Sequence, residues 1–237
     1  MNGTLLCARY AFPPNYFQYC GPDENERLRE YLHDQDEDPK PRKLLSEFGT
    51  LYSYLSTIAH ANAIADPLDP RVVSAYWIGN SLLEQLSPEH MYQELKVGQQ
   101  LEQRLPKQYR KWLYPKVESA RLHHSFHVMN VFLRTGHLIL PVTVESMDNC
   151  RIGWGKVIKI TDDSITVSSQ RIVLTDGKLT MKTNIKRKLQ TTNTTQYHIG
   201  DLVSYHWNWV CDVLTENDVK QLEHYTLLSM KLANSTL

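Results

Sequence analysis

The chain lacks an excess of charge of either sign, because its 26 lysines and arginines balance its 26 aspartates and glutamates. Proteins that bind nucleic-acid backbones usually carry a basic excess, so a nucleic-acid partner is not expected. No apolar run approaches the roughly 20 residues that span a bilayer. The N-terminal segment 1–9 has no basic leader of the secretory type. We therefore expect a cytoplasmic protein without a membrane partner.

Cysteine is also scarce, with four residues in 237 and no Cys-x-x-Cys pair. Four cysteines in this length are too few for a disulfide scaffold, and cytosolic thiols stay reduced. The sequence has no phosphate-binding loop, no dinucleotide-binding glycine motif and no Gly-x-Ser-x-Gly elbow. Whether the protein is an enzyme is therefore left open.

The order of hydrophobic patterns predicts an α+β fold. Residues 1–137 are mainly helical in pattern, residues 138–214 contain short β-branched runs separated by turn signals, and Thr215-x-x-Asp218 begins a last helix. We expect a helical N-terminal region, a small SH3-like or OB-like β-barrel, and a C-terminal helix over 215–237 that packs back on the body.

Local signals give approximate bounds for these elements. The prolines at 13 and 14 predict a loop over 7–22, and residues 34–40 form an acidic loop. Asp69-Pro70 and Ser87-Pro88 are typical of helix starts. Helices are expected at 41–60, 70–86, 88–104, 115–135 and 216–232, and strands at 139–144, 152–160, 164–174, 178–186 and 202–210.

A histidine cluster is the first candidate site. His123 and His127 are four residues apart on the expected 115–135 helix, so their rings share a face with Asn130. Two such histidines can ligate a metal, but a His-Glu-x-x-His helix would place a glutamate between them, and here Ser125 and Phe126 intervene. The alternatives are a polar or catalytic site, a metal site, and histidines that only hydrogen-bond neighbouring groups.

Two cysteines are candidates for nucleophilic chemistry. Cys20 precedes Pro22, and a thiol at a helix N-terminus would have a lowered pKa. Cys150 and Arg151 follow Met147-Asp148-Asn149 at the expected entry to a strand, where the guanidinium could hold a carboxylate or phosphate. A free cysteine is also often a small buried hydrophobe, and both segments could be ordinary structural elements.

Two further polar residues complete the candidate site. His206 lies in the aromatic strand Ser204–Cys211, and Asn80 shares the inward helix face that carries Tyr76 and Trp77. A buried amide or imidazole needs polar partners. We therefore predict one polar site between the helical region and the barrel, with Cys20, His123, His127 and Cys150 in catalytic roles and Asn80, Asn130, Arg151 and His206 as binding residues.

Several segments together carry a resemblance to a protein family. They are Cys-Ala-Arg-Tyr-Ala-Phe-Pro-Pro-Asn…Tyr-Cys-Gly-Pro (7–22), Asp-Pro-Arg-Val-Val-Ser-Ala-Tyr-Trp-Ile-Gly-Asn (69–80), His-His-Ser-Phe-His-Val-Met-Asn (123–130), Met-Asp-Asn-Cys-Arg-Ile-Gly-Trp-Gly (147–155) and Gly-Asp-Leu-Val-Ser-Tyr-His-Trp (200–207). The chain resembles an uncharacterised family of bacterial proteins associated with NiFe-hydrogenase gene clusters. The resemblance implies a cytosolic accessory or maturation role and supplies no catalytic residues.

These observations lead to three hypotheses. The first is an accessory factor in metalloenzyme assembly that holds a transition metal or small molecule, or does thiol chemistry on it, with a metalloenzyme subunit or maturation factor as partner. The second is a non-catalytic binding or scaffold protein that uses an aromatic surface. The third is an RNA binder that uses the basic stretch Lys178–Lys188, although for that stretch we predict a solvated hairpin instead.

Overall fold

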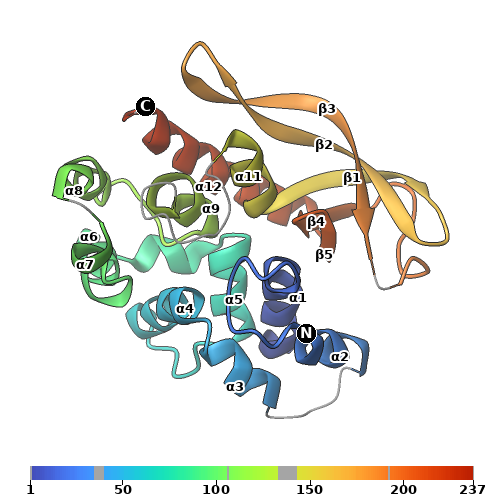
Figure 1. Cartoon of the computed structure of the whole chain (residues 1–237), viewed down its shortest axis with the longest axis horizontal. Helices are drawn as coiled ribbons and strands as arrows, with labels where there is room; N and C mark the ends of the chain where they lie inside the picture. Colours follow the sequence, from blue (N-terminus) through green and yellow to red (C-terminus); the bar gives the residue numbers. More distant parts are fainter. Residues whose placement is uncertain (1, 35–39, 106, 133–142, 192, 237) are drawn as a thin grey trace.

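A computed structural model describes residues 2–34, 40–105, 107–132, 143–191 and 193–236 of the chain. It has a mixed α+β fold. Along the chain, a series of helices comes first, a five-stranded sheet follows, and one C-terminal helix comes last (Figure 1). Among the described helices, none combines the length and the hydropathy of a membrane span.

The helices before the sheet are short and interrupted. The α-helices are α1 (Gly3–Tyr16), α2 (Asn25–Asp34), α3 (Lys40–Ser46), α4 (Gly49–Ala61), α5 (Pro70–Trp77), α6 (Pro88–Gln93), α7 (Leu101–Arg104), α8 (Lys107–Leu113), α9 (His124–Phe126) and α11 (Val144–Cys150). Two 3₁₀ turns, η1 (Ser81–Gln85) and η3 (Tyr114–Lys116), and two π-helical segments, η2 (Glu94–Gly98) and η4 (His127–Phe132), lie between them.

The sheet consists of β1 (Gly153–Ile160), β2 (Ser164–Thr175), β3 (Lys178–Gln190), β4 (Leu202–His206) and β5 (Trp209–Leu214). Antiparallel pairs join β1 to β2 and β4, β2 to β3, and β4 to β5, whereas one parallel pair, Gln190 with Trp209, links β3 to β5. The assignment to an SH3-like or OB-like barrel stays a prediction.

The C-terminal helix α12 (Glu216–Asn234) packs against α9 and η4 as well as against β3 and β5, so it joins the helices to the sheet (Figure 1). Its start is the predicted capping box, in which Thr215 accepts from the Asp218 amide. One apolar core includes Leu6 of α1, Trp154 of β1 and Leu222 of α12. The division into regions 1–137, 138–214 and 215–237 stays a prediction.

The expectation of a loop at residues 7–22 is wrong over its first half, because α1 continues to Tyr16 through Pro13 and Pro14. A proline inside a helix removes one backbone hydrogen bond and costs about 3 kcal/mol. Here both prolines lie near the C-terminal end of a helix that is buried along most of its length. Tertiary burial therefore outweighs the local preference.

Several other predicted bounds also need correction. The predicted helix 41–60 is two helices, α3 and α4, that are separated at Glu47 and Phe48. The helix that begins at Asp69-Pro70 is confirmed at its start, where Asp69 accepts from the Arg71 amide, but it ends at Trp77. The predicted helix 88–104 starts correctly at Pro88 and is then interrupted by η2 and by Gln100, whose φ is +51°.

The largest errors fall in segments that carry candidate residues. The predicted helix 115–135 begins only at His124, and residues 147–150 end helix α11 instead of entering a strand. The predicted strand 202–210 is divided by a tight turn at Trp207 and Asn208, which both have positive φ. The end of the 115–135 helix, most of the 139–144 strand and most of the 34–40 loop lie outside the described residues.

A buried ion network fixes α11 against the sheet. Asp148 receives the Arg151 guanidinium at 2.9 Å, the Ile172 amide at 2.8 Å and the Arg187 guanidinium. The side chains of Asp148 and Arg151 are 2% and 0% exposed. Arg187 is thus an exception to the solvated hairpin that was predicted for Lys178–Lys188, whose lysines are exposed.

Removing the charge of Asp148 should destabilise the protein strongly. Asp148→Asn leaves two arginines with no carboxylate in this buried network, and breaking a buried ion pair costs about 3–5 kcal/mol in the free energy of unfolding. Glu24→Gln disrupts an exposed pair with Arg27 and should cost less than about 1 kcal/mol. Urea unfolding of both variants measures the difference, and equal losses would contradict a structural role of the network.

Candidate functional site

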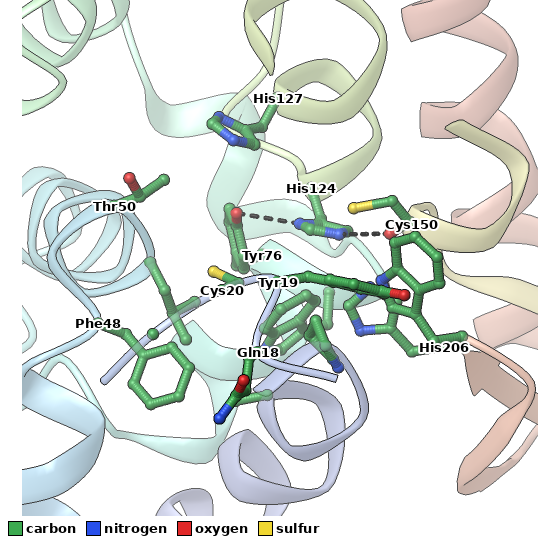
Figure 2. Close-up of a pocket in the computed structure, with 16 residues that line it drawn as sticks. Gln18, Tyr19, Cys20, Phe48, Thr50, Tyr76, His124, His127, Cys150 and His206 are labelled. Carbon is green, nitrogen blue, oxygen red and sulfur yellow. Dashed lines mark hydrogen bonds between the residues drawn. The ribbon is translucent and has the colours of Figure 1, made fainter. Parts of the chain in front are cut away.

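A cavity of about 320 Å³ lies where the helical region meets the end of β4 (Figure 2). Its walls come from the C-terminal half of α1 and the segment after it, the start of α4, the end of α5, the α9–η4 junction, the end of α11 and the β4–β5 turn. Most of the wall is apolar or aromatic. The exceptions are two cysteines, three histidines, Gln18 and Thr50, and none of the lining residues is an aspartate, glutamate, lysine or arginine.

The cavity brings together four of the predicted site residues, namely Cys20, His127, Cys150 and His206. They come from four separate parts of the chain. His124 lines the same cavity and was not among the predicted residues.

His206 is held by a backbone carbonyl of α1. Pro14 has no N–H to donate to the Tyr10 carbonyl in the helical i→i−4 pattern, and this carbonyl accepts a hydrogen bond of 2.8 Å from His206 Nδ1. A carbonyl only accepts, so the bond places the proton on Nδ1. Nε2 of His206 is buried and has no hydrogen-bond partner. Burial lowers the pKa of His206 to about 4, so Nε2 carries a lone pair at neutral pH.

Cys150 is the last residue of α11 and lies beside this imidazole. His124, Cys150 and His206 each offer one ligand atom, and these three atoms lie within 4.8 Å of one another. The pKa of the Cys150 thiol is raised to about 12, mainly by burial and to a smaller extent by negative charge on Cys20, against a lowering by the Trp207 indole. The thiol is therefore protonated when no cation is near.

His124 already uses both ring nitrogens. Nε2 donates to the Cys150 carbonyl at 2.8 Å, and the Tyr76 hydroxyl donates to Nδ1 at 3.1 Å (Figure 2). Burial, followed by the nearby His206 and His127, keeps the pKa of His124 well below its usual value. His124 is thus a neutral imidazole, and ligation through it requires one of these two bonds to be exchanged.

Two stacked tyrosines position the histidine pair. The Tyr54 and Tyr76 rings lie 5.3 Å apart, and Tyr54 shares a hydrogen bond of 3.1 Å with His127 Nδ1. The His124 and His127 rings are 6.5 Å apart with planes 22° from parallel. Because helix α9 begins at His124, the pair that shares a face is 124 and 127, not 123 and 127.

Cys20 lies on the segment between α1 and α2, and its thiol points into the cavity (Figure 2). The residue is accessible to solvent, although surrounding protein raises the pKa of its thiol to about 11. The expected lowering by a helix N-terminus is wrong, because α2 begins only at Asn25. All four cysteines are free thiols in the structure.

Two predicted residues, His123 and Asn80, cap helical turns outside the cavity. His123 Nδ1 accepts from the Ser125 amide at 3.1 Å as the N-cap of α9, and its ring stacks on Tyr225. Asn80 accepts from the Leu82 amide and donates to the Arg71 carbonyl. Both side chains satisfy local backbone groups, as capping requires.

Asn130 and Arg151 are also outside the cavity. Asn130 is fully buried, accepts from Lys116 Nζ at 2.9 Å and donates to the Ser229 carbonyl. Arg151 donates to Asp148 and to the carbonyls of Ile152 and Gln170. Its planar fork therefore holds groups of the protein itself and is not directed to the cavity.

The stability of the metal-free protein should fall as the pH falls below 6.5. The pKa values of His206 (about 4) and His123 (about 3) lie below the ordinary 6.5, with burial as the main cause. Protons therefore bind preferentially to the unfolded chain, and stability that is complete above pH 6.5 is lost as the pH falls toward the folded-state values. At pH 5 each ring should account for a loss of about 2 kcal/mol.

Urea unfolding at pH 7.5 and at pH 5, with chelator present, measures this loss. His123→Asn keeps a side-chain acceptor for the Ser125 amide and removes the titrating group. The variant should therefore lose about 2 kcal/mol less than the parent protein between the two pH values. An equal loss in both proteins would contradict a neutral, buried His123.

Comparison with curated proteins and with solved structures finds no match. A family model matches residues 1–237, and its description is "Family of unknown function (DUF6390)". This agrees with the resemblance to an uncharacterised family and does not extend to hydrogenase gene clusters. The chain therefore belongs, over its whole length, to the family of unknown function DUF6390.

Proposed function

We propose that the protein binds a transition-metal ion in the cavity, with Cys150 Sγ and His206 Nε2 as its first two ligands and His124 as the third. The observation that carries the proposal is the arrangement of His206. Its Nδ1 donates to a backbone carbonyl, while its buried Nε2 has no partner. Metal-ligating histidines are usually oriented in this way, by a hydrogen bond from the nitrogen that does not bind the metal.

His124 can take the same form by a change of tautomer. If its proton moves to Nδ1, that nitrogen donates to the Tyr76 hydroxyl oxygen and Nε2 turns its lone pair to the ion. The bond from Nε2 to the Cys150 carbonyl is then lost. Tyr76 would thus become the orienting partner of a second ligating imidazole.

The donor set favours ions of borderline or soft character. Thiolate and imidazole together suit Zn²⁺ and copper, whereas Mg²⁺ and Ca²⁺ prefer oxygen ligands. The histidines are already neutral, as metal binding requires. The Cys150 thiol, with a pKa of about 12, has to lose its proton, and a bound cation supplies the electrostatic reason for that loss.

An accessory role in metalloenzyme assembly belongs to the same proposal. A factor that holds a metal for a metalloenzyme subunit or a maturation partner needs such a site, and a cytoplasmic location would keep its thiols reduced. The connection with hydrogenases depends on the sequence resemblance alone. We also propose that the sheet, whose ends meet at the Gln190–Trp209 pair, is a small barrel of SH3-like or OB-like type.

A second candidate function is docking of a partner on aromatic residues next to the cavity. Tyr16 and Phe17 are 43% and 37% exposed and contact each other, and Tyr16 also contacts Trp209. This scaffold hypothesis needs no metal, so measurement of metal binding separates it from the first.

Metal binding should depend on Cys150 and His206. Titration of chelator-treated protein with Co²⁺ should give a thiolate-to-cobalt charge-transfer band, and Zn²⁺ should remove the band by competition. Cys150→Ser should weaken the band, and His206→Ala should weaken Co²⁺ binding at least tenfold, about 1.4 kcal/mol.

Two matched variants serve as controls for this titration. His60→Ala removes an exposed histidine of α4, and Cys7→Ala removes a buried thiol of α1 outside the cavity. Both should bind Co²⁺ as the parent protein does. The same band in Cys150→Ser, or no band in the parent protein, would contradict the proposal.

A further inference from the structure

We propose that Cys20 joins the metal site as a second thiolate, and that it decides whether the cavity retains a divalent ion. This inference depends on the proposed metal site. Cys20 Sγ is not in the close group formed by His124, Cys150 and His206, but it lines the same cavity. It would therefore take the coordination position that these three ligands leave open toward the cavity.

The charge of the cavity is the first argument. None of its lining residues is an aspartate, glutamate, lysine or arginine, and the buried imidazoles are neutral. A divalent ion held by Cys150 alone would leave one uncompensated positive charge in a largely apolar surrounding, which is costly. Two thiolates and two imidazoles make the complex of a divalent ion neutral, and they form a Cys₂His₂ set of the kind that zinc adopts.

The segment that carries Cys20 is the second argument. Asn15 Nδ2 donates to the carbonyls of Cys20 and Pro22, at 3.0 and 2.7 Å, and so fixes the backbone on both sides of Gly21. Gly21 has a φ of +87°, and a Cβ at this position would lie 2.1 Å from the Phe48 ring. Gln18 also has a positive φ, of +58°. Glycine adopts such a φ without strain, whereas a left-handed non-glycine residue such as Gln18 is uncommon and is more frequent at functional sites.

The binding step is an exchange of protons for a cation without redox chemistry. The two thiols of Cys20 and Cys150 each lose a proton to solvent, two metal–sulfur bonds form, and the ion keeps its oxidation state. A monovalent soft ion such as Cu⁺ becomes neutral with Cys150 alone. The proposal therefore predicts that a divalent ion needs Cys20 for tight binding and that Cu⁺ does not.

The test is X-ray absorption spectroscopy on zinc-loaded protein, which counts sulfur ligands at about 2.3 Å. The parent protein should show two sulfur ligands and Cys20→Ser one. Zn²⁺ affinity should fall at least tenfold in Cys20→Ser, while Cu⁺ affinity, measured without oxygen against a competing chelator, should change less than threefold. Cys20→Ala serves as a second variant, Cys7→Ala as the thiol control, and circular dichroism reports folding.

Two outcomes would overturn the role of Cys20. One is a single sulfur ligand in the parent protein together with unchanged Zn²⁺ affinity in Cys20→Ser. The other is an equal loss of Zn²⁺ and Cu⁺ affinity in Cys20→Ser, because the charge of the ion would then not decide whether it needs Cys20. Failure of the proposed function looks different, since the parent protein would then bind neither ion with a sulfur ligand.

Discussion

The hydrogen bond between His206 Nδ1 and the Tyr10 carbonyl is the contact on which the arrangement of the cavity depends. It joins the last residue of β4 to the middle of α1, two elements that are 196 residues apart in sequence. Because Pro14 offers no N–H to this carbonyl, the helix leaves an acceptor for the imidazole inside the protein. The bond fixes the tautomer of His206, and with it the nitrogen that faces the cavity. Pro14 in α1 thereby helps to determine that Nε2 of His206 is the nitrogen with a free lone pair.

The second constraint is the pairing of tyrosines with histidines. Tyr54 and Tyr76 come from α4 and α5, and their stacked rings each meet one histidine at the start of the α9–η4 segment. Each tyrosine hydroxyl shares a hydrogen bond with Nδ1 of one histidine, so the two tyrosines orient both imidazoles. The π-helical segment η4 begins at His127, and such segments are frequent at functional sites. One backbone irregularity of this protein thus begins at a histidine of the cavity wall.

Local signals in the sequence were enough for the helix starts at Pro70, Pro88 and Glu216, because each capping side chain and the backbone amide that donates to it lie within three positions of each other. Cys150 and His206 could also be predicted as a candidate pair, because Cys150 lies in a run of polar residues and His206 lies among aromatic residues. The roles of His123 and His124 could not, since they depend on where helix α9 begins. Because the helix begins at His124 and not at residue 115, His123 is its N-cap and His124 faces the cavity. The helix through Pro13 and Pro14 was not predictable either, because burial by distant segments stabilises it.

Burial acts in opposite directions on the two kinds of candidate ligand. It lowers the pKa of His206 to about 4, which keeps the imidazole in the form that binds a metal, but it raises the pKa of Cys150 to about 12, which keeps the thiol in the form that does not. Without a cation, the imidazoles of His124 and His206 and the thiol of Cys150 are therefore neutral, so these three side chains place no uncompensated charge among the apolar residues. A bound cation would shift the protonation equilibrium of the Cys150 thiol alone. Its field would stabilise the thiolate, while the histidines would keep their neutral form. Under the proposed metal-binding function, the burial that keeps the cavity wall neutral would thus favour cations that have an affinity for sulfur.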